Sequence, residues 1–238
     1  MIDGRDTDDI DDDGIQLPTL VYMAREKRPN FPHHFKAGAM NALIRVSPEI
    51  SNGPIILNLD CDMYLNSANT IQEALCFFMD EKRGQQIAYV QFPLSFNNIT
   101  KNDLYSSVFL VAYKIELVGF GGNGGSLYCG IGCFQKRENL SGMYFKDYYK
   151  PKWDTKTKGE DKRIADELIE ASKALVSYTY EKGTQWGKEM GLLYGIPVED
   201  IVIGLMITCR VWKSIYYNPQ EKRAFMGVAP TTFGVLLV

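Results

Sequence analysis

The chain has 238 residues, of which 45% are hydrophobic and 23% charged, and its formal net charge is −3. This is the composition of an ordinary globular protein, long enough to bury a substantial core in one large domain or two small ones. Seven aspartates and one arginine among the first thirteen residues make the start strongly acidic. We therefore expect residues 1–17 to be a disordered arm and residues 18–238 to form the folded domain.

The sequence also bears on the environment of the protein. It contains no signal peptide and no run of roughly eighteen apolar residues, so we expect no membrane-spanning segment within it. Its five cysteines are scattered and include no Cys-x-x-Cys pair, which indicates reduced thiols in a cytosolic environment. We expect no nucleic-acid polymer among its partners.

The first half of the chain alternates apolar runs with amphipathic stretches. In chain order we expect a strand at 20–24, a helix around 37–46, a strand at 55–59, a helix at 71–79 and a strand at 87–92. Thr70 and Glu73 have the spacing of a capping box for the second helix. This alternation predicts an α/β fold with an open, mainly parallel central sheet and flanking helices.

The second half is less regular. We expect a helix at 103–118, a glycine-rich loop at 119–125, a strand-like segment at 128–134, an exposed lysine-rich excursion at 146–163, a helix at 161–182, a helix-forming apolar stretch at 201–209 and a strand at 211–217. No internal repeat is visible.

Two aspartates follow directly on the apolar strand at 55–59. Asp60 and Asp62 are separated by one residue, and side chains at that spacing in an extended segment point the same way. Two carboxylates held together repel unless a proton or a cation lies between them, and oxygen ligands suit Mg²⁺ or Mn²⁺. Ligands of open α/β sheets bind beyond the carboxyl ends of the strands. The pair therefore indicates a divalent-metal site for a phosphorylated or nucleotide-linked substrate, with two solvated loop carboxylates as the alternative.

Four other residues are candidates with two interpretations each. Lys36 begins a helix, where a cation opposes the helix dipole, so it either binds a phosphate or is simply exposed. Glu199 and Asp200 precede the apolar stretch at 201–209, and they either complement a helix dipole or include a general base. Trp186 is either a core residue or a stacking platform for a sugar.

Four motifs, in this order, resemble those of the plant cellulose synthase superfamily. They are His-His-Phe-Lys-Ala-Gly-Ala-Met-Asn-Ala-Leu at 33–43, Leu-Asp-Cys-Asp-Met-Tyr at 59–64, Gln-Phe-Pro at 91–93 and Gly-Ile-Gly-Cys-Phe at 130–134. The resemblance runs from about residue 18 to the end of the chain, and the combination is far more specific than any one motif. Short insertions and the segment 25–29 are more similar to the cellulose synthase-like branches of G or E type than to true cellulose synthases.

The resemblance implies a GT-A fold and a processive, inverting family 2 glycosyltransferase that moves a sugar, glucose first among the candidates, from a UDP-sugar to a growing β-glycan. Asp62 would ligate Mn²⁺ or Mg²⁺ bound to the nucleotide diphosphate, and Asp60 would support the metal and the nucleotide. Lys36 would contact the UDP moiety. Asp200, within a segment that matches the family's Thr-Glu-Asp motif except at Val198, would be the general base.

The resemblance further implies the acceptor side of the site and the location of the enzyme. The segment 128–134, with Gly132 and Cys133, matches the stretch that packs beside the acceptor, and Trp186 and Glu199 complete the implied substrate-binding set. The acceptor would be a glycan or a small molecule. The full-length protein would be held in a membrane, Golgi, endoplasmic reticulum or plasma membrane, with this domain on the cytosolic face.

Three features of the family are not found in the sequence. They are an earlier nucleotide-binding Asp, a Gln-x-x-Arg-Trp motif expected shortly after Val238, and the membrane helices. We therefore expect a truncated catalytic domain with weak or no turnover. A nucleotide-binding but inactive fragment is one alternative. A metal-dependent phosphohydrolase with a covalent aspartyl-phosphate at Asp60 is another, although that class normally has Thr or Val where this chain has Tyr64.

Overall fold

The computed structural model describes residues 10–100, 102, 111–146, 165–177, 179–220 and 222–229. Helices and short strands are mixed in this part of the chain, which confirms the α/β class. The helices are α1 (Phe35–Ile50), α2 (Thr70–Phe78), η1 (Gly84–Gln86), η2 (Ala112–Glu116, a π-helical turn), α4 (Leu117–Gly122), α5 (Arg137–Leu140), α6 (Ala165–Val176) and α7 (Glu199–Cys209). The strands are β1 (Ile55–Asn58), β2 (Met63–Leu65), β3 (Ile87–Gln91), β4 (Leu94–Phe96), β5 (Cys133–Lys136), β6 (Lys213–Tyr216) and β7 (Phe225–Gly227).

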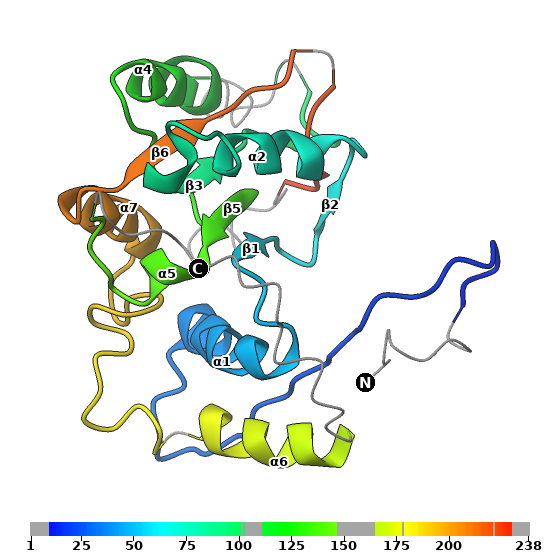
Figure 1. Cartoon of the computed structure of the whole chain (residues 1–238), viewed down its shortest axis with the longest axis vertical. Coiled ribbons are helices and arrows are strands. Elements are labelled where there is room, and N and C mark those ends of the chain that lie inside the picture. The colour runs from blue at the N-terminus through cyan, green and yellow to red at the C-terminus, as the bar shows by residue number, and fades with distance from the viewer. Residues whose placement is uncertain are drawn as a thin grey trace.

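Four strands form the main sheet in the order β1-β5-β3-β6 (Figure 1). β3 pairs in parallel with β6, whereas β5 pairs antiparallel with both β1 and β3. β1, β3 and β6 therefore run in one direction, although two of the three pairings in this sheet are antiparallel and the expected sheet was mainly parallel. β5 lies between β1 and β3 and runs in the opposite direction. The expected alternation of strands and helices did not include such an antiparallel strand.

The strands that share a direction end in one row. Asn58 of β1 and Gln91 of β3 are both paired with Cys133, the first residue of β5, and Gln91 is also paired with Tyr216 of β6. The carboxyl ends of three strands thus lie at one edge, where open α/β sheets bind their ligands. The chain leaves β1 at this edge and reaches Asp60 two residues later.

The core has two parts, one on each face of the main sheet. One cluster includes Tyr89, Tyr128 and Trp212 and packs against apolar residues of α1 and α7. The other includes Phe92 and Phe225 and packs against α2 and a second, three-stranded sheet in the order β2-β7-β4. The burial of apolar side chains on both faces fixes the sheet between the helices.

Helices α1 and α6 lie side by side at the end of the molecule away from α2 and α4 (Figure 1). The buried residues of α1 recur at helical spacing and are Ala37, Gly38, Asn41, Ala42, Arg45 and Val46. One face of α1 therefore packs against the protein, and its first turn is brought to the carboxyl edge of the sheet.

Two expected elements are wrong. The strand expected at 20–24 does not form: Leu20 makes only a single bridge and residues 21–24 form no strand. Tyr22 is 87% exposed, so this apolar run is not buried as a central strand would be. Residues 119–125 are not entirely a loop, because α4 continues to Gly122. A Cβ at Gly121 would lie only 3.1 Å from the Cβ of Tyr216, so the glycine allows the helix to approach β6 closely.

Two local details also differ from expectation. The N-cap of α2 is Asn69, and Thr70 is the first residue of the helix. The Thr70 hydroxyl is buried and has no hydrogen-bond partner in the described part of the chain, so the capping box does not form. The strand expected at 128–134 begins only at Cys133. Gly130 and Gly132 have φ of +75° and +64°, a left-handed conformation that interrupts a strand.

The remaining expected elements are confirmed with shifted ends, or they lie partly outside the residues that the structure describes. α1, β1, α2, β3, α7 and β6 coincide with expected elements, and α6 ends at Val176 rather than near 182. Residues 1–9 of the acidic arm, 103–110 of one expected helix and 147–164 lie outside the described residues. Residues 10 and 16 are joined by an isolated antiparallel bridge around a turn at Asp11.

Candidate active site

Lys36 and Asp60 meet at the carboxyl edge of the sheet. The Lys36 ammonium lies 2.5 Å from Asp60 Oδ1, and the lysine side chain is half exposed. Lys36 comes from the first turn of α1, and Asp60 follows the end of β1. The structure thus brings together one residue predicted for the nucleotide and one predicted for the metal and the nucleotide.

The backbone that leads into Lys36 is strained. His34 and Phe35 have φ of +53° and +45°, a left-handed conformation that costs a non-glycine residue about 1–2 kcal/mol. Arg25 donates two hydrogen bonds to backbone carbonyls of this turn, at 2.8 and 3.1 Å. The His34 ring also stacks on Tyr194, with ring centroids 3.8 Å apart. These contacts fix where α1 begins, and they therefore fix the position of Lys36.

Asp62 lies in the turn after β1, in which the Met63 N–H donates to the Asp60 carbonyl at 3.1 Å. It is exposed, and no hydrogen bond or ion pair joins its carboxylate to another described residue. Within the described ranges no three His, Cys, Asp or Glu residues are grouped so that they could hold a metal ion. The two aspartates could supply only part of a coordination shell. This fits Mg²⁺ or Mn²⁺, which commonly take their remaining ligands from water and substrate phosphates.

Asp200 lies in the first turn of α7 and presents its two carboxylate oxygens to different surroundings. Oδ1 accepts a hydrogen bond from the Ile201 N–H at 2.8 Å. Oδ2 faces Gly130, because a Cβ built on that glycine would lie 3.4 Å from Oδ2. One oxygen is therefore used by the helix itself, and the other borders the space that Gly130 leaves open.

Asp200 and Lys36 line the same cavity, which has a volume of about 100 Å³. A second cavity of about 320 Å³ runs between α1 and β1 and reaches Asp60. Lys36, Asn58 and Tyr128 line both. Glu199 also lines the smaller cavity, beside Asp200. The Lys36 ammonium and the carboxylates of Asp60 and Asp200 thus line two adjoining cavities, whereas Asp62 lines neither.

Burial controls the protonation of the groups behind these cavities. Burial, and secondly the nearby charge of Asp200, raises the pKa of the Cys129 thiol to about 12. Burial likewise raises the pKa of Tyr128 well above the ordinary value of a tyrosine. Both groups are therefore protonated at neutral pH, and neither can act as a base there in place of Asp200.

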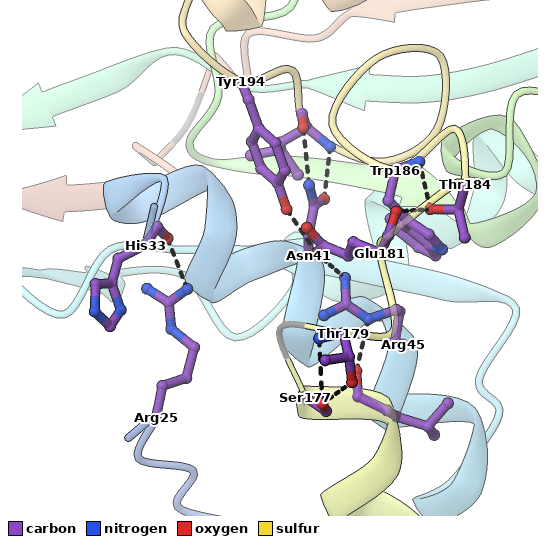
Figure 2. A network of polar contacts seen from close by, with 12 residues as sticks. Arg25, His33, Asn41, Arg45, Ser177, Thr179, Glu181, Thr184, Trp186 and Tyr194 are labelled. Atoms are coloured by element: carbon purple, nitrogen blue, oxygen red, sulfur yellow. Dashed lines mark hydrogen bonds and ion pairs between the residues drawn. The ribbon is translucent and has the colours of Figure 1, made fainter. Parts of the chain in front are cut away.

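Trp186 belongs to a polar network centred on Arg45 and lines neither of the two cavities (Figure 2). The Arg45 guanidinium lies over the Trp186 ring at 5.1 Å and forms an ion pair with Glu181. Glu181 also accepts a hydrogen bond from the Tyr194 hydroxyl at 2.8 Å. The structure gives Trp186 a packing partner, and its stacking on a sugar stays a prediction.

Gly132 and Cys133 are buried behind the cavity wall. A Cβ on Gly132 would lie 2.8 Å from a methyl group of Leu94, and Cys133 is fully buried in the core. Gly130 is the residue of this loop that borders Asp200, and it was missed as a site residue. The available signal was the repeated Gly-x-Gly at 130–132, which indicates a loop that must approach another group closely.

A larger cavity of about 660 Å³ lies between α1, α6 and residues 21–28. Its lining is mainly apolar and includes none of Asp60, Asp62 and Asp200. Lys36, Asp60 and Asp200 line the two smaller cavities instead, and these are therefore the candidate active site.

The sequence model of the cellulose synthase family matches residues 1–160 and 155–236. The chain belongs to this family. It is 52% identical over 98% of its length to cellulose synthase-like protein E1 of Oryza sativa subsp. japonica, and 38% identical over 90% to quillaic acid 3-O-glycosyltransferase CSL1 of Saponaria officinalis. It is 34% identical over 92% to cellulose synthase A catalytic subunit 2 (UDP-forming) of Arabidopsis thaliana.

These comparisons confirm the resemblance to the cellulose synthase-like branch, since identity to the E1 protein exceeds identity to the cellulose synthase A subunit. The GT-A type of α/β fold agrees with the family. The chain spans 31%, 33% and 28% of the lengths of the three relatives, about a third in each case. Among the described residues, no helix combines the length and the apolar character needed to cross a membrane.

Proposed function

We propose that this chain forms part of the catalytic centre of an inverting glycosyltransferase that uses a UDP-sugar as donor. The observation that carries the proposal is the cavity shared by Lys36 and Asp200, with Lys36 paired to Asp60 at the carboxyl edge of the sheet. Membership of the cellulose synthase family, and relatives named as glycosyltransferases or as UDP-forming, support the reaction class.

The donor half of the proposed site consists of Lys36, Asp60 and Asp62. Asp62 and Asp60 would hold Mn²⁺ or Mg²⁺ against the diphosphate, where such a cation neutralises the charge of the departing UDP. In the absence of the donor, Lys36 neutralises Asp60 through their ion pair. A diphosphate bound at this edge would offer the exposed ammonium a second anionic partner, so Lys36 would bind UDP as the donor enters.

The acceptor half consists of Asp200 and the space beside Gly130. In the proposed reaction the acceptor hydroxyl oxygen forms a bond to the anomeric carbon of the donor, and the bond from that carbon to UDP breaks on the opposite face. The hydroxyl proton moves to Asp200 Oδ2, which is the oxygen not bound by the helix N–H. The glycine at position 130 leaves room for the hydroxyl group next to that oxygen.

The names of the relatives suggest a donor sugar and two kinds of acceptor. We propose glucose as the donor sugar and a β-glycan as the acceptor, in line with the relative named cellulose synthase A. A small-molecule acceptor is the second candidate, because a relative with 38% identity is named as a quillaic acid 3-O-glycosyltransferase. Glu199 lines the cavity beside Asp200 and would contact the acceptor or the sugar.

We also propose that this domain works on the cytosolic face of a Golgi, endoplasmic reticulum or plasma membrane. All five cysteines are free, which supports a reducing compartment. Fractionation of cells that express the full-length protein, followed by protease protection of this domain, tests the placement. Protection of the domain inside sealed vesicles would contradict it.

Turnover of UDP-sugars tests the proposed reaction. The full-length protein should release UDP from UDP-glucose when Mn²⁺ or Mg²⁺ is present. The Asp200→Asn variant should lose this release and still bind UDP, whereas Glu167→Gln on the exposed surface of α6 should behave as wild type. Release that persists in Asp200→Asn would refute the role of the base. The same assay on residues 1–238 alone tests the expectation of weak or no turnover.

A further inference from the structure

We infer that Asn58 and Gln91 are positioning residues that hold the loop Cys129–Gly132 against Asp200. The inference rests on the proposed function, because it assigns the residues that shape the acceptor half of that site. Neither residue needs to touch the reacting atoms. They would act through the backbone of this loop, which we call the base-facing loop.

The topology places the two amide side chains on either side of the loop. Asn58 ends β1 and Gln91 ends β3, and both are register partners of Cys133, the residue that follows the base-facing loop. Register partners on neighbouring strands point to the same face of a sheet. The base-facing loop therefore ends between the amides of Asn58 and Gln91, and both amides project toward the face of the sheet that carries α1 and α7.

Gln91 binds the loop with both ends of its amide. The side chain is fully buried. Its Oε1 accepts a hydrogen bond from the Cys129 N–H at 3.0 Å, and its Nε2 donates to the Ile131 carbonyl at 2.8 Å. Nε2 also donates to the Phe92 carbonyl at 2.9 Å. A buried group with all these bonds fixes the separation of residues 129 and 131, because moving either leaves a polar atom unsatisfied.

Asn58 binds the loop from the other side. Its Nδ2 donates to the Gly130 carbonyl, and its own backbone carbonyl accepts from the Gly132 N–H at 2.9 Å. Gly130 is the residue whose missing side chain borders Asp200 Oδ2. Asn58 therefore sets the position of Gly130, a loop residue that faces the base.

The loop needs such restraints because its sequence gives it freedom. Gly130 and Gly132 both have left-handed backbones, and glycine passes between left- and right-handed conformations at little cost. The two amides select one of these conformations. Asn58 also lies two residues before Asp60, so a single strand end joins the loop at the base to the carboxylates of the donor half. This arrangement would keep the spacing of the two halves constant.

Isosteric apolar substitutions in the full-length protein test the inference. Gln91→Met and Asn58→Leu remove the amides at similar volume, and Asn139→Leu is the matched control. Asn139 is 2% exposed and donates to the Ala88 carbonyl at 2.8 Å, outside the base-facing loop. We expect Gln91→Met and Asn58→Leu to bind UDP with Mn²⁺ within about twofold of wild type and to lower kcat with UDP-glucose about tenfold to a hundredfold. The control should keep the wild-type kcat per folded molecule.

Hydrogen exchange gives a readout that does not depend on turnover. The Cys129 amide should exchange about tenfold faster in Gln91→Met than in wild type, and not in Asn139→Leu. If both test variants lower kcat no more than the control, or if exchange in the loop is unchanged, the inference is overturned while the proposed function stands. If wild type neither binds UDP nor turns over UDP-glucose, the proposed function fails, and the exchange result still decides whether the two amides hold the loop.

Discussion

Replacing Gly130 with alanine probes the acceptor half of the site most directly. The new Cβ would lie 3.4 Å from Asp200 Oδ2 and 3.5 Å from the Asp200 Cβ. A hydroxyl group must approach a general base to about 2.6–3.2 Å, so the methyl group would occupy the approach to that oxygen. A displacement of about 1 Å at a reacting group can lower the rate about a hundredfold, which corresponds to about 2.7 kcal/mol of transition-state stabilisation.

A Cβ at Gly130 would also strain the left-handed backbone at this position. A matched glycine separates this strain from the blocked approach to Asp200. Gly130 has φ of +75°, and Gly124 has φ of +95° with no atom within 4 Å of its would-be Cβ. Both substitutions to alanine should lower the free energy of unfolding by about 1–2 kcal/mol, because both place a Cβ in the left-handed region. Only Gly130→Ala should lower kcat.

The assay is UDP release from UDP-glucose at saturating donor, together with UDP binding in the presence of Mn²⁺. We expect Gly130→Ala to bind UDP as wild type does and to lose about a hundredfold in kcat, and Gly124→Ala to keep both. Equal turnover in the two variants, at equal folded fractions, would refute the placement of the acceptor hydroxyl beside Gly130 and Asp200.

Three further predictions concern stability and reactivity. Val198 is the N-cap of α7, and its side chain cannot accept a hydrogen bond from the helix N–H groups. Val198→Thr should therefore raise the free energy of unfolding by about 1 kcal/mol in urea titration, and no gain would show that the cap does not limit stability. At pH 8 a thiol reagent should label three of the five cysteines quickly, because those three are exposed. Cys129 should react slowly because burial raises its pKa to about 12, and Cys133 because it is fully buried. Fast labelling of all five thiols would contradict the packing of the loop. Arg45→Met should lower the free energy of unfolding by about 3 kcal/mol, because it leaves the Glu181 carboxylate of the buried ion pair without its cation. Lys173→Met, in the exposed pair on α6, should lower it by about 0.5 kcal/mol or less. Similar losses in the two variants would show that burial does not distinguish the pairs.

The sequence predicted the elements whose periodicity is strong. The apolar run before Asp60 correctly predicted β1, whose residues are all half-buried. The helical spacing after Lys36 correctly predicted α1, which buries one face. The same reasoning failed at 21–24, where Tyr22 is exposed although the run is apolar. The burial of a short apolar run depends on which partners the fold provides for it, and that is not contained in the run itself.

The candidate site was predictable where charge and position coincide. Asp60 and Lys36 stood out by their places at a strand end and a helix start, and the structure joins them in an ion pair. Gly130, Asn58 and Gln91 were not predicted as site residues. Gly130 had a local signal in the Gly-x-Gly at 130–132, but the importance of Asn58 and Gln91 comes from the antiparallel insertion of β5, which aligns the ends of β1 and β3 with the base-facing loop. A pairing between strands far apart in the sequence leaves no local pattern from which it could be inferred.

The central claim is that one pair of carboxylates serves the donor and a separate carboxylate serves the acceptor. Calorimetric titration of UDP with Mn²⁺, combined with UDP release from UDP-glucose, tests this in wild type, Asp62→Asn and Asp200→Asn. The account predicts that Asp62→Asn loses Mn²⁺-dependent UDP binding and that Asp200→Asn binds UDP normally but does not turn over. Normal UDP binding by Asp62→Asn, or normal turnover by Asp200→Asn, would contradict it.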